Sequence, residues 1–475
     1  MPESAARVFD RLATTEPPTH TRTLFDRAVV LGGSVAGLLA ARVLADHAER
    51  VVVVERDERT ERAEERRGVP QSAQVHTLLP GGRRQLDRWF EGFSKEAVAE
   101  GAVLAKPGRF RAYFNGEEKV DDPTAELITG SRPFLESLVR RRVLALPNVT
   151  AARGRATAVD VVDGRAVGVR HTGDDGVEVT EEADFVVDAM GRSSRLGDWL
   201  EATGWEKPSM ERMPIDINYT TAYFRRSAEP EVVAGISFWD EDERPDGVAP
   251  AAFQAVEGGR WMIMFGGYGD DRPGATPEEF RRICDRLPEP FRTAASEEML
   301  GDVRQYKQAD SRRRAYHALE RFPARLVSVG DAVASFNPIY GQGMTSAALH
   351  ASCLSEWLRS EPALDAPATG FFALQKVVVD SAWQTSATPD LALPHIGGPY
   401  PRGYRVARWV TGQILDATVT DVEVAKRFNA VTFMTAHPNT LATPGTVLRA
   451  VRTNLGRRLG RRSSRRAGEP RPDRG

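Results

Sequence analysis

The sequence predicts an α/β fold: a parallel sheet covered by helices, an inserted antiparallel sheet, and helices toward the C-terminal end. Short, largely apolar runs at 28–31, 51–54, 185–187 and 326–329 have the composition of strands buried on both faces of a parallel sheet. Between 210 and 310, aromatic and β-branched residues recur between Gly, Asp and Pro turns, which is typical of an antiparallel sheet. The first domain is therefore expected to be interrupted by the second and then re-entered.

Composition excludes several classes of protein. The 475 residues are 41% hydrophobic and 27% charged, which suits a chain with a large core rather than a disordered or fibrous one. The formal net charge is −2, although 452–474 holds nine Arg against two acidic residues, so the remainder is acidic and a nucleic-acid-binding protein is not expected. The two cysteines, Cys284 and Cys353, allow neither a CxxC motif nor a disulfide framework, and both are expected in the core.

The pattern divides the chain into five parts. No apolar stretch is long enough to span a membrane and no signal peptide is evident, so we expect a cytoplasmic protein. The expected parts are a flexible leader at 1–24, a nucleotide-binding domain at 25–205 and 311–365, a substrate-binding sheet lobe at 206–310, a helical region at 366–450, and a basic disordered tail at 451–475.

A βαβ unit opens the first domain. Its first strand leads into Gly32-Gly33-Ser34-Val35-Ala36-Gly37, and its second strand ends at Glu55-Arg56. In a dinucleotide site, such glycines allow a tight turn and close packing, and the helix N-terminus binds the pyrophosphate. Ser34 replaces the middle glycine of the usual pattern, and Glu55 lies where an acid binds the adenosine ribose. The unit predicts an ADP-containing dinucleotide; a plain strand–helix turn is the alternative.

A second motif follows the last apolar strand. Gly330-Asp331-Ala332 is succeeded by Asn337-Pro338-Ile339-Tyr340-Gly341-Gln342-Gly343-Met344, and a helix is expected from about Thr345. Pro and two glycines leave this loop without side-chain bulk. The helix N-terminus could stabilise the negative charge of a reduced flavin, and Asp331 could bind the ribityl or pyrophosphate part. An ordinary strand–loop–helix connection with a capping Asp is the alternative.

Taken in order, with Asp188-Ala189-Met190-Gly191 between them, these motifs resemble the flavoprotein monooxygenases of the para-hydroxybenzoate hydroxylase type. Within that group, Arg67-Gly68-Val69-Pro70-Gln71, His76-x-Leu78-Leu79 and the whole of 330–344 are most similar to bacterial polyketide and polyether epoxidases. Leu79-Pro80-Gly81-Gly82 is similar to the squalene epoxidase pattern. The resemblance extends from about Ala28 to Leu441. Two features depart from the family pattern: Ser34 in place of the middle Gly, and Asp188-Ala189-Met190-Gly191 where the hydroxylases have an Asp-Gly pair.

The resemblance implies a Rossmann-like FAD-binding domain with an inserted antiparallel substrate domain. It also implies an FAD-dependent monooxygenase: NAD(P)H reduces the flavin, directly or through a separate flavin reductase, and O2 then forms a flavin C4a-hydroperoxide that transfers one oxygen atom. Alkene epoxidation of a lipophilic natural-product intermediate is the implied reaction. The implied cofactor-binding residues are Gly32, Gly33, Ser34, Val35, Ala36, Gly37, Glu55, Arg56, Arg67, Arg132, Asp331, Pro338, Gly341, Gly343 and Met344.

Several alternatives remain open at this point. Aromatic hydroxylation would use the same oxidant, a flavin-dependent reductase or dehydrogenase of prenyl or polyketide substrates would need no oxygen, and a degenerate flavoprotein would bind FAD as a scaffold. A halogenase is disfavoured because the Trp-x-Trp-x-Ile-Pro signature is absent. No catalytic residue can be assigned from spacing and no metal-ligand cluster is evident. His76 is expected to be a structural hydrogen-bonding residue rather than a catalytic one.

Overall fold

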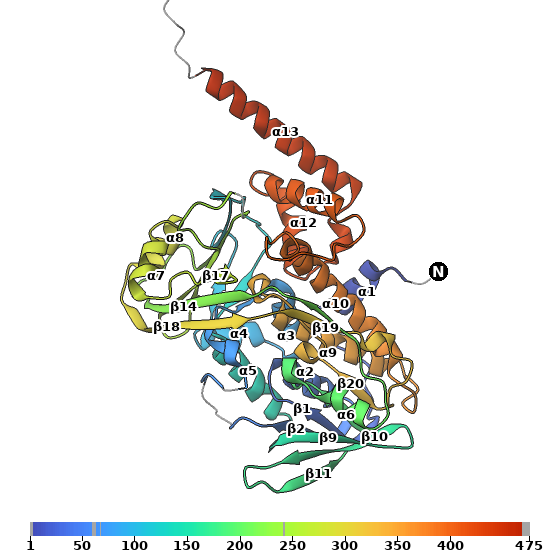
Figure 1. Cartoon of the computed structure of the whole chain (residues 1–475). Coiled ribbons are helices and arrows are strands. Elements are labelled where there is room, and N and C mark those ends of the chain that lie inside the picture. The colour runs from blue at the N-terminus through green and yellow to red at the C-terminus, as the bar shows by residue number, and fades with distance from the viewer. Residues whose placement is uncertain (1–2, 59–62, 67, 241–242, 468–475) are drawn as a thin grey trace, which may run out of the picture.

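The first domain is built on a five-stranded parallel sheet, shown in the computed structural model of the chain (Figure 1). The structure describes residues 3–58, 63–66, 68–240 and 243–467. The strand order is β20 (Leu326–Ser328), β12 (Phe185–Asp188), β1 (Phe25–Leu31), β2 (Ala48–Glu55) and β8 (Val149–Arg153). The central residues of β20, β12, β1 and β2 are almost fully buried, because helices and a smaller three-stranded sheet pack against them, whereas the edge strand β8 is partly exposed.

Three helices place the candidate site at the carboxyl ends of these strands. α2 (Val35–Leu44) connects β1 to β2 and packs against α5 (Arg132–Leu144) and α9 (Gly343–Arg359). α2 and α9 begin within the two glycine motifs that the sequence singled out, and α5 begins at Arg132. Ser131 caps α5 by accepting a hydrogen bond from the backbone N–H of Phe134 at 3.3 Å. In parallel sheets, ligands bind where such helix N-termini converge.

A seven-stranded sheet forms the second domain. Its order is β18 (Met299–Gln308), β14 (Ile217–Arg225), β17 (Arg260–Tyr268), β16 (Ala251–Val256), β15 (Ala234–Phe238), β5 (Phe110–Phe114) and β6 (Glu117–Glu118), and only the β15–β5 pair is parallel. Two helices, α7 (Pro277–Cys284) and α8 (Glu289–Ala295), cover one face and bring Phe280 and Phe291 into a separate core. The fold class predicted from the sequence is confirmed.

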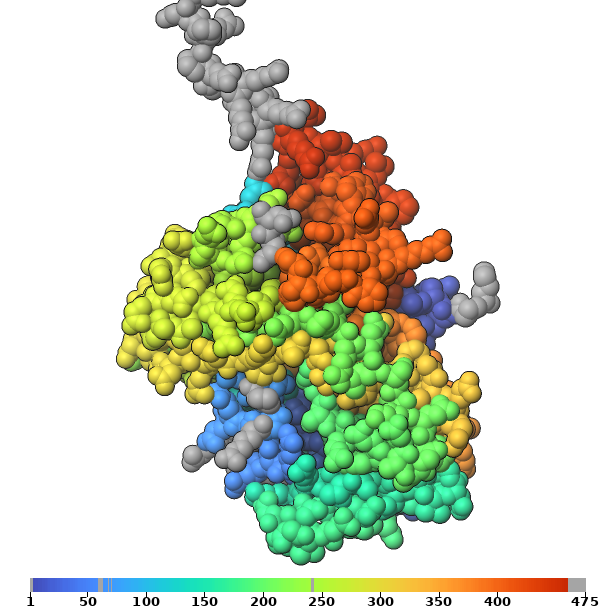
Figure 2. All heavy atoms as spheres, in the orientation of Figure 1, coloured from blue at the N-terminus to red at the C-terminus, as the bar shows by residue number. Residues whose placement is uncertain are grey.

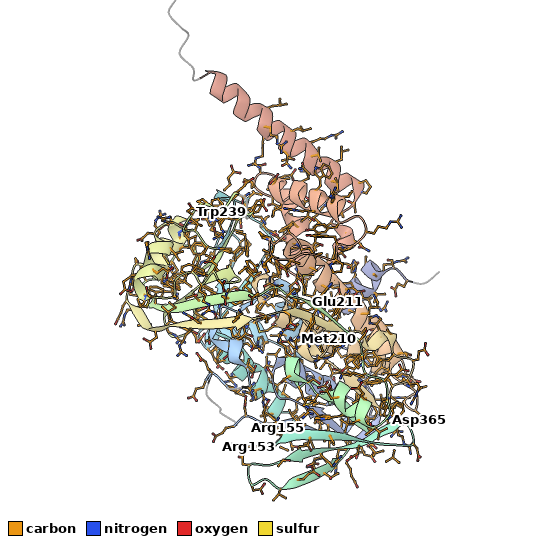
Figure 3. The ribbon with its side chains drawn as sticks, in the orientation of Figure 1. Arg153, Arg155, Met210, Glu211, Trp239 and Asp365 are labelled. Atoms are coloured by element: carbon orange, nitrogen blue, oxygen red, sulfur yellow. The ribbon has the colours of Figure 1, made fainter. Side chains whose placement is uncertain are left out.

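The boundary predicted for the inserted lobe is wrong at one edge. The sequence assigned all of 25–205 to the first domain, but β5 and β6 at 110–118 complete the lobe sheet. The physical reason is that β15 would otherwise leave a row of backbone N–H and C=O groups unpaired. Figure 3 shows Trp239 at this side of the lobe, where its ring closes over Gly116 in the β5–β6 turn.

Smaller sheets and helices accompany the two main sheets. Three-stranded sheets are formed by β9 (Arg155–Val162), β10 (Arg165–Thr172) and β11 (Glu178–Glu182); by β13 (Met210–Met213), β19 (Ser311–Arg314) and β21 (Ala334–Ser335); and by β3 (Thr77–Leu78), β7 (Leu127–Thr129) and β4 (Val103–Ala105). The remaining helices before the C-terminal region are α3 (Pro80–Trp89), α4 (Phe93–Ala99) and α6 (Leu196–Ala202). In Figure 3, Arg153 and Arg155 mark the lower end of the molecule, at β8 and β9.

The expected flexible leader contains an ordered helix. α1 (Ala5–Leu12) buries Phe9 and Leu12 completely against α9 and α10 (Thr369–Asp390). The buried Arg88 on α3 donates hydrogen bonds to the carbonyls of Leu12 at 3.3 Å and Glu16 at 2.9 Å. The prediction of a flexible segment at 1–24 is therefore wrong for 5–16, because an apolar stripe and an internal arginine anchor it.

The expected disordered tail is also partly helical. α11 (Tyr404–Ala417), α12 (Val422–Thr432) and α13 (Pro444–Ala467) form a C-terminal module, in which α13 extends through much of the basic segment. Thr446, Ala450 and Asn454 are buried on one side of α13, and Arg457 pairs with Glu117 at 2.5 Å. These contacts order 451–459, contrary to the prediction, while 468–475 lie outside the described residues. No helix in the described part of the chain combines the length and apolar character needed to cross a membrane.

Candidate functional site

The turn between β1 and α2 depends on an unusually close approach of backbone segments. Gly32 has a φ of +109°, and a Cβ there would lie 2.4 Å from the carbonyl oxygen of Ala189. A Cβ on Gly37 would lie 1.8 Å from the carbonyl oxygen of Gly32. Both contacts are too short for any side chain, so only glycine allows α2 to begin this close to the strand ends. The sequence-predicted roles of these glycines therefore have a geometric basis.

A buried acid, Glu136 on α5, organises the other side of this turn. It accepts hydrogen bonds from the Ser34 hydroxyl at 2.7 Å and from Arg132 at 3.2 Å. It also pairs with Arg140 at 2.7 Å and with Arg66. Burial opposes ionisation of Glu136, but the charges of the three arginines and the serine hydrogen bond outweigh it and lower its pKa to about 2. Glu136 thus holds two predicted site residues, Ser34 and Arg132, in place as a carboxylate.

Glu55 lies at the tip of β2, as the sequence predicted, and is tied to the glycine turn. Its carboxylate accepts a hydrogen bond from the backbone N–H of Gly33 at 2.7 Å and another from that of Asp57 at 2.9 Å. Arg66 approaches the same carboxylate at 3.4 Å. Its binding of ribose hydroxyls stays a prediction.

The second motif packs directly on the first. A Cβ on Gly330, whose φ is +63°, would lie 2.5 Å from the Cβ of Ala36 at the start of α2. The neighbouring Asp331 has no hydrogen-bond or ion-pair partner among the described residues. Burial raises its pKa, an effect that the charges of Arg192 and Arg132 oppose. The structure therefore brings the two glycine motifs together and leaves one carboxyl group at their junction.

The loop at 337–344, which leads into α9 and is called the flavin loop below, has the features of a cradle for a planar group. Gly341 has a φ of +66°, and a Cβ on the exposed Gly343 would meet open space. The hydroxyl oxygens of Thr345 and Ser346, at the start of α9, are buried without a hydrogen-bond partner among the described residues. Pro338 begins the turn and Met344 is buried beneath it. Unsatisfied polar groups beside an open glycine surface fit a ligand rich in hydrogen-bonding atoms, such as a flavin.

Three other residues singled out in the sequence have different outcomes. Arg56 is exposed beside the strand tip, and Arg67 lies outside the described residues, whereas Arg66 is buried in the cluster around Glu136. His76 makes a hydrogen bond of 2.7 Å with the carbonyl of Gln74, and burial together with the charge of Arg132 lowers its pKa to about 4. A histidine that stays neutral over the physiological range is consistent with the structural role expected for it.

One buried cluster contains an acid that the sequence did not indicate. Asp390, at the end of α10, accepts hydrogen bonds from Asn337 and from the hydroxyl of Tyr340, both at 2.9 Å. The Tyr219 hydroxyl of the lobe sheet approaches Asn337 at 3.4 Å. The second oxygen of Asp390 has no partner among the described residues, and burial raises its pKa to about 7. In the sequence Asp390 follows the largely polar run 384–389, and nothing in its spacing relates it to the flavin loop.

Comparison with known proteins identifies the cofactor of this site. The model of a family described as an FAD-binding domain matches residues 27–361. The chain belongs to this family. FAD is therefore its cofactor, as the two glycine motifs predicted, and the reductant typical of the family is NAD(P)H. The chain is also 35% identical over 426 residues to Protein Rv3254 of Mycobacterium tuberculosis, covering 85% of this chain and 88% of that protein.

Solved structures share the fold at low sequence identity. p-Nitrophenol 4-monooxygenase PnpA from Pseudomonas putida has a TM-score of 0.62 at 19% identity, over 86% of this chain and 98% of its own. PqsL from Pseudomonas aeruginosa has a TM-score of 0.60 at 19% identity, over 81% and 99%. The flavin-dependent brominase Bmp2 has a TM-score of 0.58 at 14% identity, over 91% and 99%. These likenesses establish the architecture around the FAD-binding domain, while the residue contacts proposed for FAD stay predictions.

Replacing Gly37 with Ala should abolish FAD retention. The added methyl group would lie 1.8 Å from the carbonyl oxygen of Gly32, so α2 must move away from the turn. The measurement is the ratio of flavin to protein absorbance after purification, with circular dichroism to check folding. Gly412→Ala in α11, where a Cβ meets open space, is the matched control. Full FAD occupancy in a folded Gly37→Ala protein would contradict the assignment of this turn.

Asp331→Ala should weaken FAD binding about tenfold to a hundredfold, because a hydrogen bond to a charged acceptor contributes roughly 1.5–3 kcal/mol. The measurement is the dissociation constant from titrating apoprotein with FAD and following flavin fluorescence. Asp302→Ala, at an exposed position of β18, should leave this constant unchanged. An unaltered constant for Asp331→Ala would show that this carboxyl group does not contact the cofactor.

Asp390 should make stability fall as pH rises. From about pH 4 to about pH 7 the unfolded chain ionises at this residue while the folded protein keeps it protonated, so the free energy of unfolding should drop by up to about 4 kcal/mol. Asp390→Asn keeps an oxygen for Asn337 and Tyr340 and removes the ionisation. Denaturant titrations across this range should show the free energy of unfolding of the variant increasing relative to that of the wild type as pH rises. Asp380→Asn is the control, and a pH-independent difference for Asp390→Asn would refute the raised pKa.

Proposed function

We propose that the protein is an FAD-dependent monooxygenase that inserts one oxygen atom from O2 into a lipophilic natural-product intermediate, with alkene epoxidation as the reaction. The supporting observation is the surface opposite the flavin loop. Ile339 of that loop would lie 3.4 Å from a Cβ on Gly266 of β17, and Ile217 and Tyr219 of β14 lie beside the same glycine. The flavin loop therefore packs against a buried apolar and aromatic wall of the lobe sheet, and this apolar boundary supports a lipophilic substrate beside the expected flavin edge.

Bound FAD, once reduced, activates O2, so that substrate, O2, NAD(P)H and a proton give oxygenated product, water and NAD(P)+. The chain itself contributes binding and exclusion of water. The glycine turn and the Glu136 cluster hold the ADP half, the N-terminus of α9 stabilises negative charge near the loop, and the wall of β14 and β17 positions an apolar substrate. An alkene requires no protein base, which agrees with the absence of an assignable catalytic residue in the sequence.

The electrons come from NAD(P)H, which either docks transiently or acts through a separate flavin reductase. The support for this proposal is that the sequence carries a single dinucleotide fingerprint, already used by FAD. A second resident nucleotide domain is therefore not part of the proposal.

Aromatic hydroxylation is the second candidate, and Asp390 favours it. A phenol reacts more readily when a base accepts its proton, and Asp390, whose pKa burial raises to about 7, accepts a hydrogen bond from Tyr340 at the flavin loop. PnpA, whose name specifies p-nitrophenol, has the same architecture. So has the brominase, which means that the shared fold does not select among these reactions.

The proposed function is tested by oxygen-isotope incorporation. Holoenzyme would be incubated under ¹⁸O2 with NADPH, and in parallel with NADH and a flavin reductase, using an aliphatic polyene and a phenol of similar size. Epoxidation predicts one ¹⁸O atom in the polyene product and little reaction with the phenol. Labelled phenol product alone would establish hydroxylation instead. Saturation of the polyene without O2 consumption would refute the monooxygenase proposal in favour of a reductase.

A further inference from the structure

Large apolar side chains gather on the surface of the C-terminal module. Among the described residues, ten such side chains are exposed, and six of them lie between 400 and 459. These six are Tyr400, Val406, Trp409, Leu448, Leu455 and Leu459. Figure 2 shows the module as one end of the molecule, opposite the β9–β11 sheet. A soluble protein rarely concentrates its exposed apolar side chains in this way without a binding partner.

The outer face of α13 forms an apolar stripe. Leu448, Leu455 and Leu459 are separated by seven and four residues, which places them on one side of the helix. Their exposed fractions are 50%, 53% and 66%. The opposite side carries the buried residues Thr446 and Ala450, which pack within the module, so the stripe faces outward. Arg452 is exposed beside it, and the sequence continues with four arginines between 461 and 466.

α11 presents the same combination of residues. Val406 and Trp409 are exposed by 66% and 53%, and the arginines at 402, 405 and 408 are exposed around them. None of these three arginines forms an ion pair with another residue in the described part of the chain. Other arginines of the module are paired, as Arg449 is with Asp421 at 2.7 Å. The unpaired charges therefore coincide with the exposed apolar side chains.

A groove of about 650 Å³ opens beside this surface. It lies between the end of α10 and the first turns of α11, and it starts one residue after Asp390, the acid that binds the flavin loop. Its walls include Leu391, Leu393, Ile396, Tyr400, Tyr404 and Val406. The exposed surface thus adjoins a largely apolar groove, with Arg405 and Arg408 also at its wall.

We propose that α11 and α13 dock the protein on the surface of an anionic lipid bilayer, with the apolar side chains inserted at the interface and the arginines at the headgroups. Charge decides between the possible occupants. A second copy would bring like-charged arginines together, which is unfavourable, and a nucleic acid would leave the leucine stripe without an apolar partner. Basic residues interleaved with Trp and Leu on a helix are typical of interfacial binding to anionic lipids. This inference does not depend on the proposed oxygenation.

The test is sedimentation of the holoenzyme with vesicles of phosphatidylcholine alone or mixed with phosphatidylglycerol. We expect binding to the mixed vesicles only, weakened by added salt. Neutralising the three arginines in and just before α11 (Arg402→Gln, Arg405→Gln, Arg408→Gln) should lower the partition coefficient about a hundredfold. Replacing the apolar anchors (Trp409→Gln, Leu455→Gln, Leu459→Gln) should lower it at least about tenfold.

The control carries Val162→Gln and Val177→Gln, which change exposed apolar residues at the end of β9 and in the turn before β11 and should leave vesicle binding unchanged. Flavin absorbance and circular dichroism would verify that every variant is folded and loaded. No binding of the wild type to anionic vesicles, or equal binding by all variants, would overturn the proposal. So would a wild-type dimer that the apolar substitutions convert to a monomer in gel filtration without vesicle binding, because the surface would then belong to a second copy.

Discussion

The whole site depends on the close approach of α2 to the ends of β1 and β12. Two glycines, Gly32 and Gly37, allow backbone contacts that no side chain would tolerate. Because α2 begins there, its free N–H groups lie at the strand ends, where a pyrophosphate binds. Gly330 then packs on Ala36, so the second motif is positioned by the first rather than independently of it. One steric constraint therefore brings together segments about 300 residues apart in the chain.

Two buried acids, Glu136 and Asp390, add electrostatic constraints to this packing. Glu136 stands among three arginines and the Ser34 hydroxyl, and its ionised state links α5, the glycine turn and the segment after β2. A buried ion cluster of this kind contributes little net stability, since desolvation offsets most of the attraction, but it fixes geometry because removing one partner leaves a buried charge. Asp390 is the contrasting case. Among the described residues it has no cationic partner, and burial raises its pKa to about 7 at the loop that is predicted to border the flavin.

The C-terminal helices extend from the candidate site to the protein surface. α10 carries Asp390 to the flavin loop, and the groove that follows in the chain is lined by the first turn of α11, where exposed apolar residues and arginines coincide. A lipophilic substrate is poorly soluble in water, so the proposed binding to a bilayer would bring the protein to the phase in which such a substrate is concentrated. Substrate access and the proposed chemistry would then be served by different parts of one chain.

The sequence by itself determined the α/β class, the inserted antiparallel sheet and the FAD fingerprint, because buried strands and glycine turns are local patterns with a fixed period. It also marked Ser34, Arg132 and Asp331, which the structure brings to one place. It missed Glu136 and Asp390, and it misjudged residues 5–16, 110–118 and 451–459. Each of these depends on contacts between distant segments. The role of Glu136 depends on the arginines around it, and the strands at 110–118 are recognised only by the sheet that they complete. Those relations exist only once the chain is folded.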